Sequence, residues 1–428
     1  MNKRLINATS IIAISLCALA ILSSCSSTTK ETKNTNPKVL AVSSGDSIQE
    51  VIDAAQSGDV VLIDSGTYTG DIVVTTPDIT IRGEDRNDVI IDGKYKQDNG
   101  IVVAANGVRV ENLTVQSFKT NGILFQGGYE IDDQKDSTPE VLDRYQIQHV
   151  NALSNGLYGI YAFASKNGVI NNTYSSGNAD AGIYIGQCKP CNTLVYQNVA
   201  EINGIGMQGA NASQELYIYA NDFSNNRTGI QFLSETKEKK APQEAVYVVS
   251  NKANDNNQAL APATNPDLFG FGIVISGGND NFIQSNLTKN NARAGIMLVE
   301  NGTFLPNNNT FENNLSRENG VPFGFDIAYL ISGRPDVMSL GNCFQTNSFS
   351  SSSIDKIESV LPCTGSAPGP FKSQPLKAFA IPVAPSYETV APTQLSNENK
   401  PGDIDGIPKK LIAIAKPDLS GLSVPSEN

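Results

Sequence analysis

A glycine followed by an apolar–any–apolar segment recurs through the middle of this 428-residue chain. Five of the seven spacings between these glycines are 22–24 residues, and the other two, 37 and 43, equal one period plus an insertion. Two more short apolar segments, separated by Asn-rich turns, fall within each period. The units open at Gly100, Gly122, Gly159, Gly182, Gly206, Gly229, Gly272 and Gly295.

Three short strands per period, with no helical segment between them, restrict the architecture. Each strand is too short to bury a face alone, but coiling the chain lets each strand pair with its equivalent one period later, at ~4.8 Å. This predicts an all-β fold, a right-handed parallel β-helix with three short strands per coil and about eleven coils. The 44 Asn residues suit its turns, because Asn tolerates left-handed backbone and stacks its amides into ladders.

The two ends of such a stack need covers, because they are unpaired sheet edges. Ser47-Ile48-Gln49-Glu50 is a capping box, and the apolar spacing that follows predicts a short amphipathic helix ending at Gly58 as the N-terminal cap. Strand Val60-Leu62 is then expected to begin the stack. Residues 342–363 are predicted to plug the other end.

Composition divides the chain into four parts. Residues 1–24 form a signal peptide, with Lys3 and Arg4 before a short apolar stretch, and Leu22-Ser23-Ser24-Cys25 resembles the lipobox of bacterial lipoproteins. The resemblance implies that Cys25 is lipidated and that the protein is anchored to the cell membrane on the extracytoplasmic side. An ordinary secretory signal with a chance Cys is the alternative. The other parts are a flexible tether at 25–38, the β-helix with its caps at 39–365, and a Pro-rich extended tail at 366–428 with a candidate docking segment at 411–414.

Four cysteines remain in the mature chain, and an exported compartment permits disulfides. Three connectivities exist for four cysteines. We favour the local pairs Cys188–Cys191 and Cys343–Cys363. A redox or zinc role for the Cys-Lys-Pro-Cys segment would need a thioredoxin-like context or two more ligands, and neither is visible.

Strand alternation predicts a solvent-facing column formed by the middle residue of each glycine unit. Two tyrosines followed by two glutamines would offer rings for a sugar to stack on and amides for its hydroxyls; a ladder that only stabilises the stack is the alternative. We therefore interpret Tyr161, Tyr184, Gln208 and Gln231 as substrate-binding residues. The full column is Leu124, Tyr161, Tyr184, Gln208, Gln231, Val274 and Met297.

Insertions at 130–144, 234–243 and 300–309 follow the same strand type, so they should leave the coil at one edge and build one wall of a groove. Charged residues crowd the first insertion: Glu130, Asp132, Asp133, Asp136, Glu140 and Asp143. Neutral surface variation is the alternative explanation of these insertions.

Three residues are catalytic candidates. Asp180 and Arg227 occupy one equivalent position and could act as base and charge neutraliser, or form a surface ion pair. His149 is the single His, a residue type found more often in a turn or in packing than in catalysis.

Three segments resemble the opening of right-handed parallel β-helix proteins of the pectin-lyase-like superfamily: Ser47-Ile48-Gln49-Glu50-Val51-Ile52-Asp53-Ala54-Ala55, Gly66-Thr67-Tyr68 and Ile79-Thr80-Ile81-Arg82-Gly83. Repeats such as Gly182-Ile183-Tyr184-Ile185-Gly186 are similar to its exported actinobacterial members. The resemblance spans about residues 39–363. It implies the fold but not one activity, because the superfamily hosts lyases, hydrolases, epimerases and non-catalytic members. The Asn-Thr-Asp, Gly-His-Gly and Asp-Pro-His patterns of its enzymes are absent, and a chain without Trp has no Trp-containing lyase motif.

These observations leave three hypotheses: a membrane-anchored β-helix that binds carbohydrate or envelope polymer, a polysaccharide lyase or epimerase with a site near Tyr161, Asp180 and Tyr184, and a structural spacer or adhesin. The sequence predicts a monomer with no resident cofactor or metal, and a pI near 4.7 argues against nucleic acid. Removal of Lys3 and Arg4 takes the net charge from −12 to −14, so Ca²⁺ would enter only as a bridge to a polyuronate.

Overall fold

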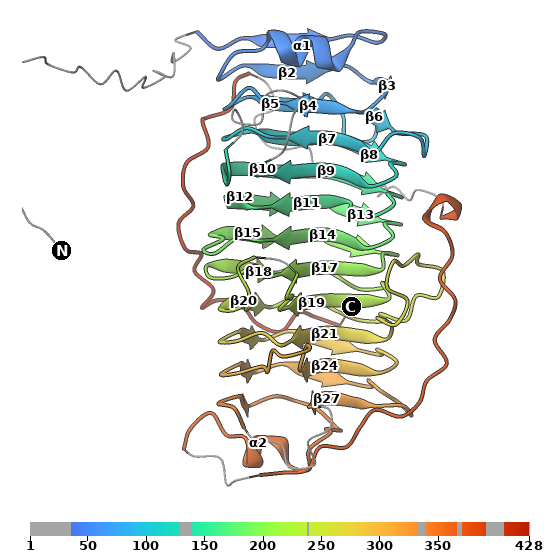
Figure 1. Cartoon of the computed structure of the whole chain (residues 1–428), viewed down its shortest axis with the longest axis vertical. Coiled ribbons are helices and arrows are strands. Elements are labelled where there is room, and N and C mark those ends of the chain that lie inside the picture. Colours follow the sequence, from blue (N-terminus) through green and yellow to red (C-terminus); the bar gives the residue numbers. More distant parts are fainter. Residues whose placement is uncertain are drawn as a thin grey trace, which may run out of the picture. The chain divides into compact units, whose positions relative to one another are not determined.

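The computed structural model describes residues 36–128, 139–237, 239–331, 339–365, 370–390 and 406–427. They belong to the unit Asn34–Asn428; the other unit, Met1–Lys33, and with it Cys25, lies outside the described residues. The strands of this unit pair in parallel with the equivalent strands one coil before and one coil after (Figure 1). The predicted parallel β-helix is therefore confirmed.

One sheet of ten strands carries the glycine units. Its strands are β4 (Ile72–Val74), β7 (Asn99–Val103), β9 (Asn121–Gln126), β11 (Ile160–Phe163), β14 (Ala181–Gly186), β17 (Ile205–Ala210), β19 (Thr228–Leu233), β21 (Phe271–Ser276), β24 (Ala294–Val299) and β27 (Phe325–Leu330).

A second sheet has sixteen strands, twelve of which follow one continuous path. The path is β1 (Val39–Val42), β2 (Val60–Ile63), β5 (Thr80–Gly83), β8 (Arg109–Gln116), β10 (Leu142–Leu153), β12 (Ser165–Asn171), β15 (Thr193–Tyr196), β18 (Leu216–Tyr219), β20 (Val246–Val249), β22 (Phe282–Gln284), β25 (Thr310–Glu312) and β28 (Cys343–Gln345). The ten strands of the first sheet and the twelve strands along this path agree with the eleven coils expected from the sequence to within one coil.

Shorter strands lie at the third side of the coil. They are β3 (Gly66–Tyr68), β6 (Val89–Asp92), β13 (Tyr174–Ser176) and β16 (Val199–Glu201), and the separate pair β23 (Leu287–Lys289) and β26 (Leu315–Arg317).

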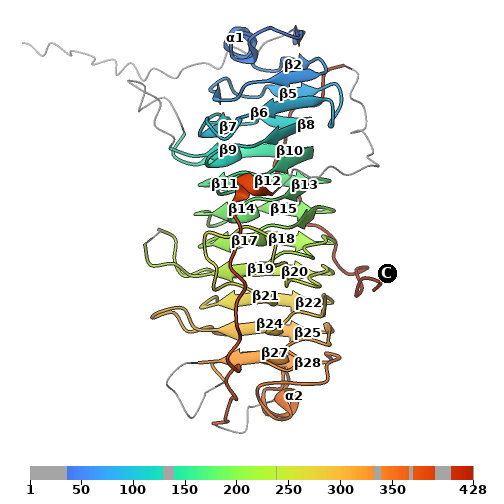
Figure 2. The same ribbon diagram turned by 90° about the vertical axis from the view of Figure 1, so that its right-hand side faces the viewer.

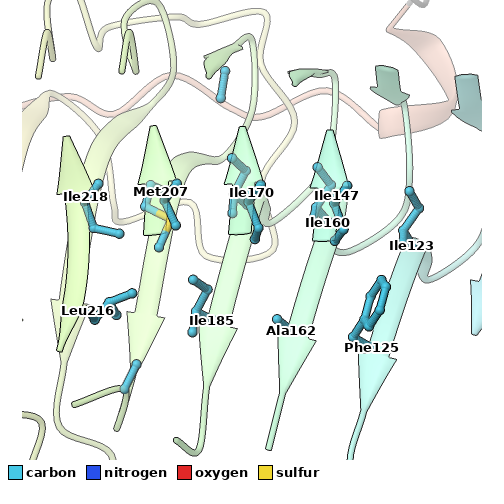
Figure 3. Packing of buried hydrophobic residues seen from close by; sticks show 14 of the residues in the cluster. Ile123, Phe125, Ile147, Ile160, Ala162, Ile170, Ile185, Met207, Leu216 and Ile218 are labelled. Carbon is cyan, nitrogen blue, oxygen red and sulfur yellow. The ribbon is translucent and has the colours of Figure 1, made fainter. Parts of the chain in front are cut away.

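The core is built from columns of equivalent residues (Figure 3). In the ten-stranded sheet Ile160 pairs with Ile123 and with Ile183, and all three side chains are fully buried. Figure 3 shows such residues pointing inward from successive strands. Burial of each contributes about 1.5–3 kcal/mol, so the stack gains stability with every coil.

Buried asparagines form ladders at the turns, as the composition predicts. In each step the backbone N–H of one Asn donates to Oδ1 of the Asn one coil later, at 2.9–3.1 Å. One ladder ends on the carboxylate of Asp326 and a second on that of Glu358. The first ladder is Asn155, Asn178, Asn203, Asn226, Asn256, Asn291 and Asn319; the second is Asn198, Asn221, Asn251, Asn286, Asn314 and Asn347.

The N-terminal cap is the predicted helix, α1 (Ile48–Ala54), which ends four residues before the expected end at Gly58. The Ser47 Oγ accepts a hydrogen bond from the Glu50 N–H at 3.3 Å, and Ile48 and Ile52 are buried. The stack begins one coil earlier than predicted, because β1 pairs in parallel with β2.

The other end is covered by residues 342–363, as expected, including helix α2 (Ile357–Val360). The side chains of Ile354, Ile357 and Leu361 are buried there. Disulfides join Cys343 to Cys363 and Cys188 to Cys191, which confirms the predicted pairing.

The Pro-rich tail docks along the stack in two extended segments (Figure 2). Residues 370–390, here called the C-terminal strap, run back along the ten-stranded side and end in the 3₁₀ turn η1 (Tyr387–Thr389). Residues 406–427, the terminal segment, lie against the sixteen-stranded sheet, where Arg144 donates to the Leu411 carbonyl at 3.3 Å and Lys410 pairs with Asp78 at 2.6 Å. Of the candidate docking segment 411–414, Leu411 makes this contact through its carbonyl, whereas the Ile412 side chain is 81% exposed.

Candidate functional site

The outward column of the ten-stranded sheet has the register expected from the sequence. Leu124 pairs with Tyr161, and Tyr161 pairs with Tyr184. The column continues through Gln208, Gln231, Val274 and Met297 in successive strands. The repeat therefore places all predicted binding residues in one line across the stack.

The expectation that this column faces solvent is wrong for most of it. Tyr161 and Gln208 are half-buried, whereas Tyr184 is only 4% exposed and Gln231 only 6%. Val274 and Met297 are buried as well. The physical reason is coverage from outside: Leu268 packs against the upper part of the column and Leu376 of the strap against the lower part.

Four aromatic rings form one continuous group on this sheet, here called the aromatic surface: Tyr158, Tyr161, Tyr184 and Phe163. Tyr158 and Tyr184 have ring centroids 4.5 Å apart, and the Tyr161 ring lies 4.9 Å from that of Tyr184. Phe163 lies 5.6 Å beyond Tyr161 along the same strand. The sequence interpretation missed Tyr158 and Phe163, although Phe163, two residues after Tyr161, shares its outward parity.

An amide pair continues the surface on the next two coils. Gln208 donates through Nε2 to the Oε1 of Gln231 at 2.9 Å. This bond fixes the orientation of both side chains and presents the half-buried Gln208 amide beside the rings, whereas Gln231 is buried.

A hollow of about 410 Å³ opens where β11 ends. Phe163 and Val141 give it an apolar side, and Lys237, Lys239 and Lys240 line it together with Glu140. The aromatic surface leads into this hollow through Phe163.

The insertions leave the coil at one edge, as predicted. Residues from the first two line the same hollow, and Asn301 in the third donates to the Ser234 carbonyl in the second at 2.7 Å. Most of the acidic cluster of the first insertion (Glu130, Asp132, Asp133 and Asp136) lies outside the described residues.

Asp180 lies at the opposite edge of the sheet from the hollow, before β14. Its Oδ2 accepts from Thr264 Oγ1 at 2.8 Å, and Thr264 belongs to residues 257–270, here called the covering loop. Burial raises the pKa of Asp180 to about 6. A carboxyl group with this pKa can exchange a proton near neutral pH, the property required of a general acid or base.

Arg227 does not meet Asp180. One coil separates them, with Gly204 at the equivalent position, so the two residues are about 10 Å apart along the stack. Arg227 donates to the carbonyls of Pro266 and Pro382. The structure therefore provides neither the base–neutraliser pair nor the surface ion pair considered from the sequence.

His149 lies on the sixteen-stranded sheet, in β10, and not beside the tyrosines. Its φ of 51° places it at the left-handed corner that Asn112 and Asn172 occupy in neighbouring coils, with φ of 57° and 52°. The position is that of a turn residue.

Metal and membrane features were also sought in the described part of the chain. Its His, Cys, Asp and Glu side chains form no group of three or more that could hold a metal ion. None of its helices is long and apolar enough to cross a membrane.

The profile of the family described as "Right handed beta helix region" matches residues 86–240 and 140–316, together more than half of the chain. The chain belongs to this right-handed beta-helix family. No curated protein matches it in sequence.

Solved structures with a similar fold share little sequence with this member of the right-handed beta-helix family. The A-module of mannuronan C-5 epimerase AlgE4 from Azotobacter vinelandii is 16% identical over 70% of this chain and 90% of that one, with a TM-score of 0.47. The Dettilon tailspike protein is 10% identical over 72% and 66%, with a TM-score of 0.44. Pectate lyase Pel9A is 13% identical over 77% and 82%, with a TM-score of 0.37. Likeness at these identities concerns the fold alone.

Proposed function

We propose that this protein is a glycan-binding β-helix that holds a carbohydrate or cell-envelope polymer against the aromatic surface. The observation that carries the proposal is the continuous run of rings from Tyr158 to Phe163, which ends at the hollow. Aromatic rings offer apolar faces for sugar C–H groups, and neighbouring amides bond hydroxyls. A stack of coils holds these groups rigidly, so little ordering is needed on binding.

The lysines at the hollow indicate which glycans to test first. Lys237, Lys239 and Lys240 are all exposed, in a chain whose net charge is −12. Three lysines against the single carboxylate of Glu140 leave the described lining of the hollow positive, which offsets the general repulsion of acidic polymers. Acidic glycans should therefore bind here without a Ca²⁺ bridge.

We further propose that the protein acts at the cell membrane, held there by a lipid on Cys25. The support is the lipobox-like Leu22-Ser23-Ser24-Cys25 after an apolar stretch. Several acyl chains on one Cys would anchor the mature chain firmly. The tether at 25–38 would give the β-helix room to reach an envelope polymer.

Binding can be tested by screening soluble mature chain on a glycan array and titrating the best oligosaccharide by calorimetry. Phe163→Ala and Tyr161→Ala should each weaken binding by about 1–2 kcal/mol, because each removes an aromatic contact. Tyr196→Ala is the matched control, since Tyr196 stacks on Tyr219 at 5.2 Å on the other sheet. Equal affinity of all three variants and the parent would refute this site and favour a spacer or adhesin.

A lyase or epimerase activity is the second candidate, favoured by the raised pKa of Asp180. The same oligosaccharides should be assayed for unsaturated products, new reducing ends and epimerised residues. Turnover by the parent that Asp180→Asn abolishes, with binding retained, would establish an enzyme. Binding without turnover in the parent would leave the binding function alone.

A further inference from the structure

Arg227 is buried without a carboxylate. Its side chain has no exposed surface, its guanidinium lies 4.7 Å from the Phe269 ring, and Nη2 donates to the carbonyls of Pro266 at 3.3 Å and Pro382 at 2.8 Å. Nε and Nη1 have no hydrogen-bond partner among the described residues. Two donors are thus unpaired around a buried full charge.

Such an arrangement is costly for a structural arginine. A guanidinium offers five donors and binds a carboxylate through two of them at once. Buried donors without an acceptor lose their hydrogen bonds to water and gain none in return, which costs free energy of folding. Burial also lowers the pKa of Arg227. Two carbonyl oxygens converge on Nη2, while Nε and Nη1 lack acceptors; each of these two forms a two-donor edge with Nη2, at which an oxyanion could bind through two oxygens.

Arg293 repeats the arrangement only in part, two coils further along, because it is half-buried and lies near the Asp267 carboxylate. Its guanidinium lies 4.7 Å from the Phe271 ring, its Nη1 contacts the Asp267 carbonyl at 3.4 Å, and its Nε is unpaired. The equivalent position between the two arginines is Gly270, where an added Cβ would lie 3.1 Å from the Arg293 Cγ. The glycine leaves room for the Arg293 side chain. Arg227 and Arg293 therefore lie at the same edge of the ten-stranded sheet, about 10 Å apart along the stack.

The middle of the strap covers Arg227 through few contacts, whereas its ends are held by the buried Phe371 and by the Val390 carbonyl, which accepts from Ser154 Oγ at 2.9 Å. Its Phe379 ring lies 4.9 Å from Phe323 and 5.8 Å from Phe269, and the Lys377 N–H donates to the Phe323 carbonyl at 2.8 Å. The strap joins neither sheet, and Val383, next to Pro382, is 92% exposed. Segments with few buried contacts open at low cost while the stack stays folded.

We propose that Arg227, with Arg293 beside it, forms an oxyanion-binding site over which the C-terminal strap is a displaceable cover. The Pro382 carbonyl oxygen accepts from Nη2 of Arg227 at the position that one oxygen of a bound carboxylate, sulfate or phosphate group would take. A full negative charge competes well with a neutral carbonyl for a guanidinium. The site is independent of the proposed glycan binding, since a free anion would occupy it too.

The test is hydrogen–deuterium exchange of the strap in the full mature chain, with inorganic phosphate against sodium chloride of equal ionic strength. Phosphate should speed exchange of the Lys377 amide, which donates to the Phe323 carbonyl at 2.8 Å, roughly tenfold, because displacing Pro382 lifts this part of the strap. Phe379→Ala, which loosens the strap, should respond at a lower phosphate concentration. Arg227→Gln should show fast exchange without phosphate and no response to it, and the half-exposed Arg293→Gln should weaken the response.

Two further probes identify the source of the anion. A hyaluronan tetrasaccharide carries carboxylates, and cellotetraose is its uncharged control. A response to phosphate and hyaluronan alike indicates a general oxyanion site, and a response to hyaluronan alone assigns the anion to a glycan. If Phe379→Ala responds to neither phosphate nor hyaluronan, the site is refuted, and because this variant keeps Arg227 that result does not depend on the folding of Arg227→Gln.

Discussion

Removing Asn226 should interrupt the first ladder at its middle. Its Oδ1 accepts from both the backbone N–H and the Nδ2 of Asn203, and its own Nδ2 donates to the carbonyls of Ala200 and Ser224. Asn226→Ala deletes all four bonds at once. The Asn203 backbone N–H then remains buried without an acceptor, whereas its Nδ2 keeps two other acceptors.

The cost follows from these contacts. An orphaned buried N–H costs about 1–3 kcal/mol, and the three other bonds contribute about 0.5–1.5 kcal/mol each. We therefore expect Asn226→Ala to lower the free energy of unfolding by about 4 kcal/mol. Because each coil contacts only its neighbours, a break at this level also separates the upper from the lower coils.

Urea unfolding followed by tyrosine fluorescence and circular dichroism measures this, since the chain has no Trp. The matched control is Asn225→Gly, which changes an exposed neighbour with φ of 59° where glycine is well tolerated, and it should cost under about 1 kcal/mol. If Asn226→Ala is no more destabilising than Asn225→Gly, the ladder does not stabilise the stack and the reasoning is refuted.

Three more outcomes are expected. The pKa of Asp180 is raised from 3.8 to about 6, so the folded state holds this proton more tightly than the unfolded state does. The parent should therefore lose stability relative to Asp180→Asn as the pH rises from about 4 to 6. A stability difference in urea titrations that does not change with pH would contradict this. Replacing Cys343 and Cys363 by Ala should cost about 3 kcal/mol, more than replacing the other cysteine pair, because their disulfide closes a longer loop; equal melting temperatures would argue against it. Cys25→Ala should leave the membrane fraction on cell fractionation or remain as an uncleaved precursor, and normal processing together with retention in the membrane would exclude the lipid anchor.

The repeat made the fold and the register predictable. A glycine every 22–24 residues determines which residues are equivalent, and equivalence in a parallel stack determines pairing. Tyr161 and Tyr184 were therefore placed correctly on one face without any knowledge of contacts. The same logic located the cap at Ser47, because a capping box is a local signal.

Burial of the outward column was not predictable in this way. Leu268 and Leu376 cover it, and they come from a loop and a Pro-rich tail that carry no period. Asp180 and Arg227 looked like partners because they occupy the same position in their repeats. Residues at the same position are neighbours only in adjacent repeats, and one repeat lies between these two. The segments that cover the sheet dock there from distant parts of the sequence, and the spacing of the repeat does not predict where they dock.

The most direct test of glycan binding is a crystal structure of the mature chain with the oligosaccharide that binds most tightly. We predict sugar rings against Tyr161 and Phe163, with an end of the chain in the hollow beside Lys239. Density for the sugar on the sixteen-stranded sheet, or at either end of the stack, would contradict the account.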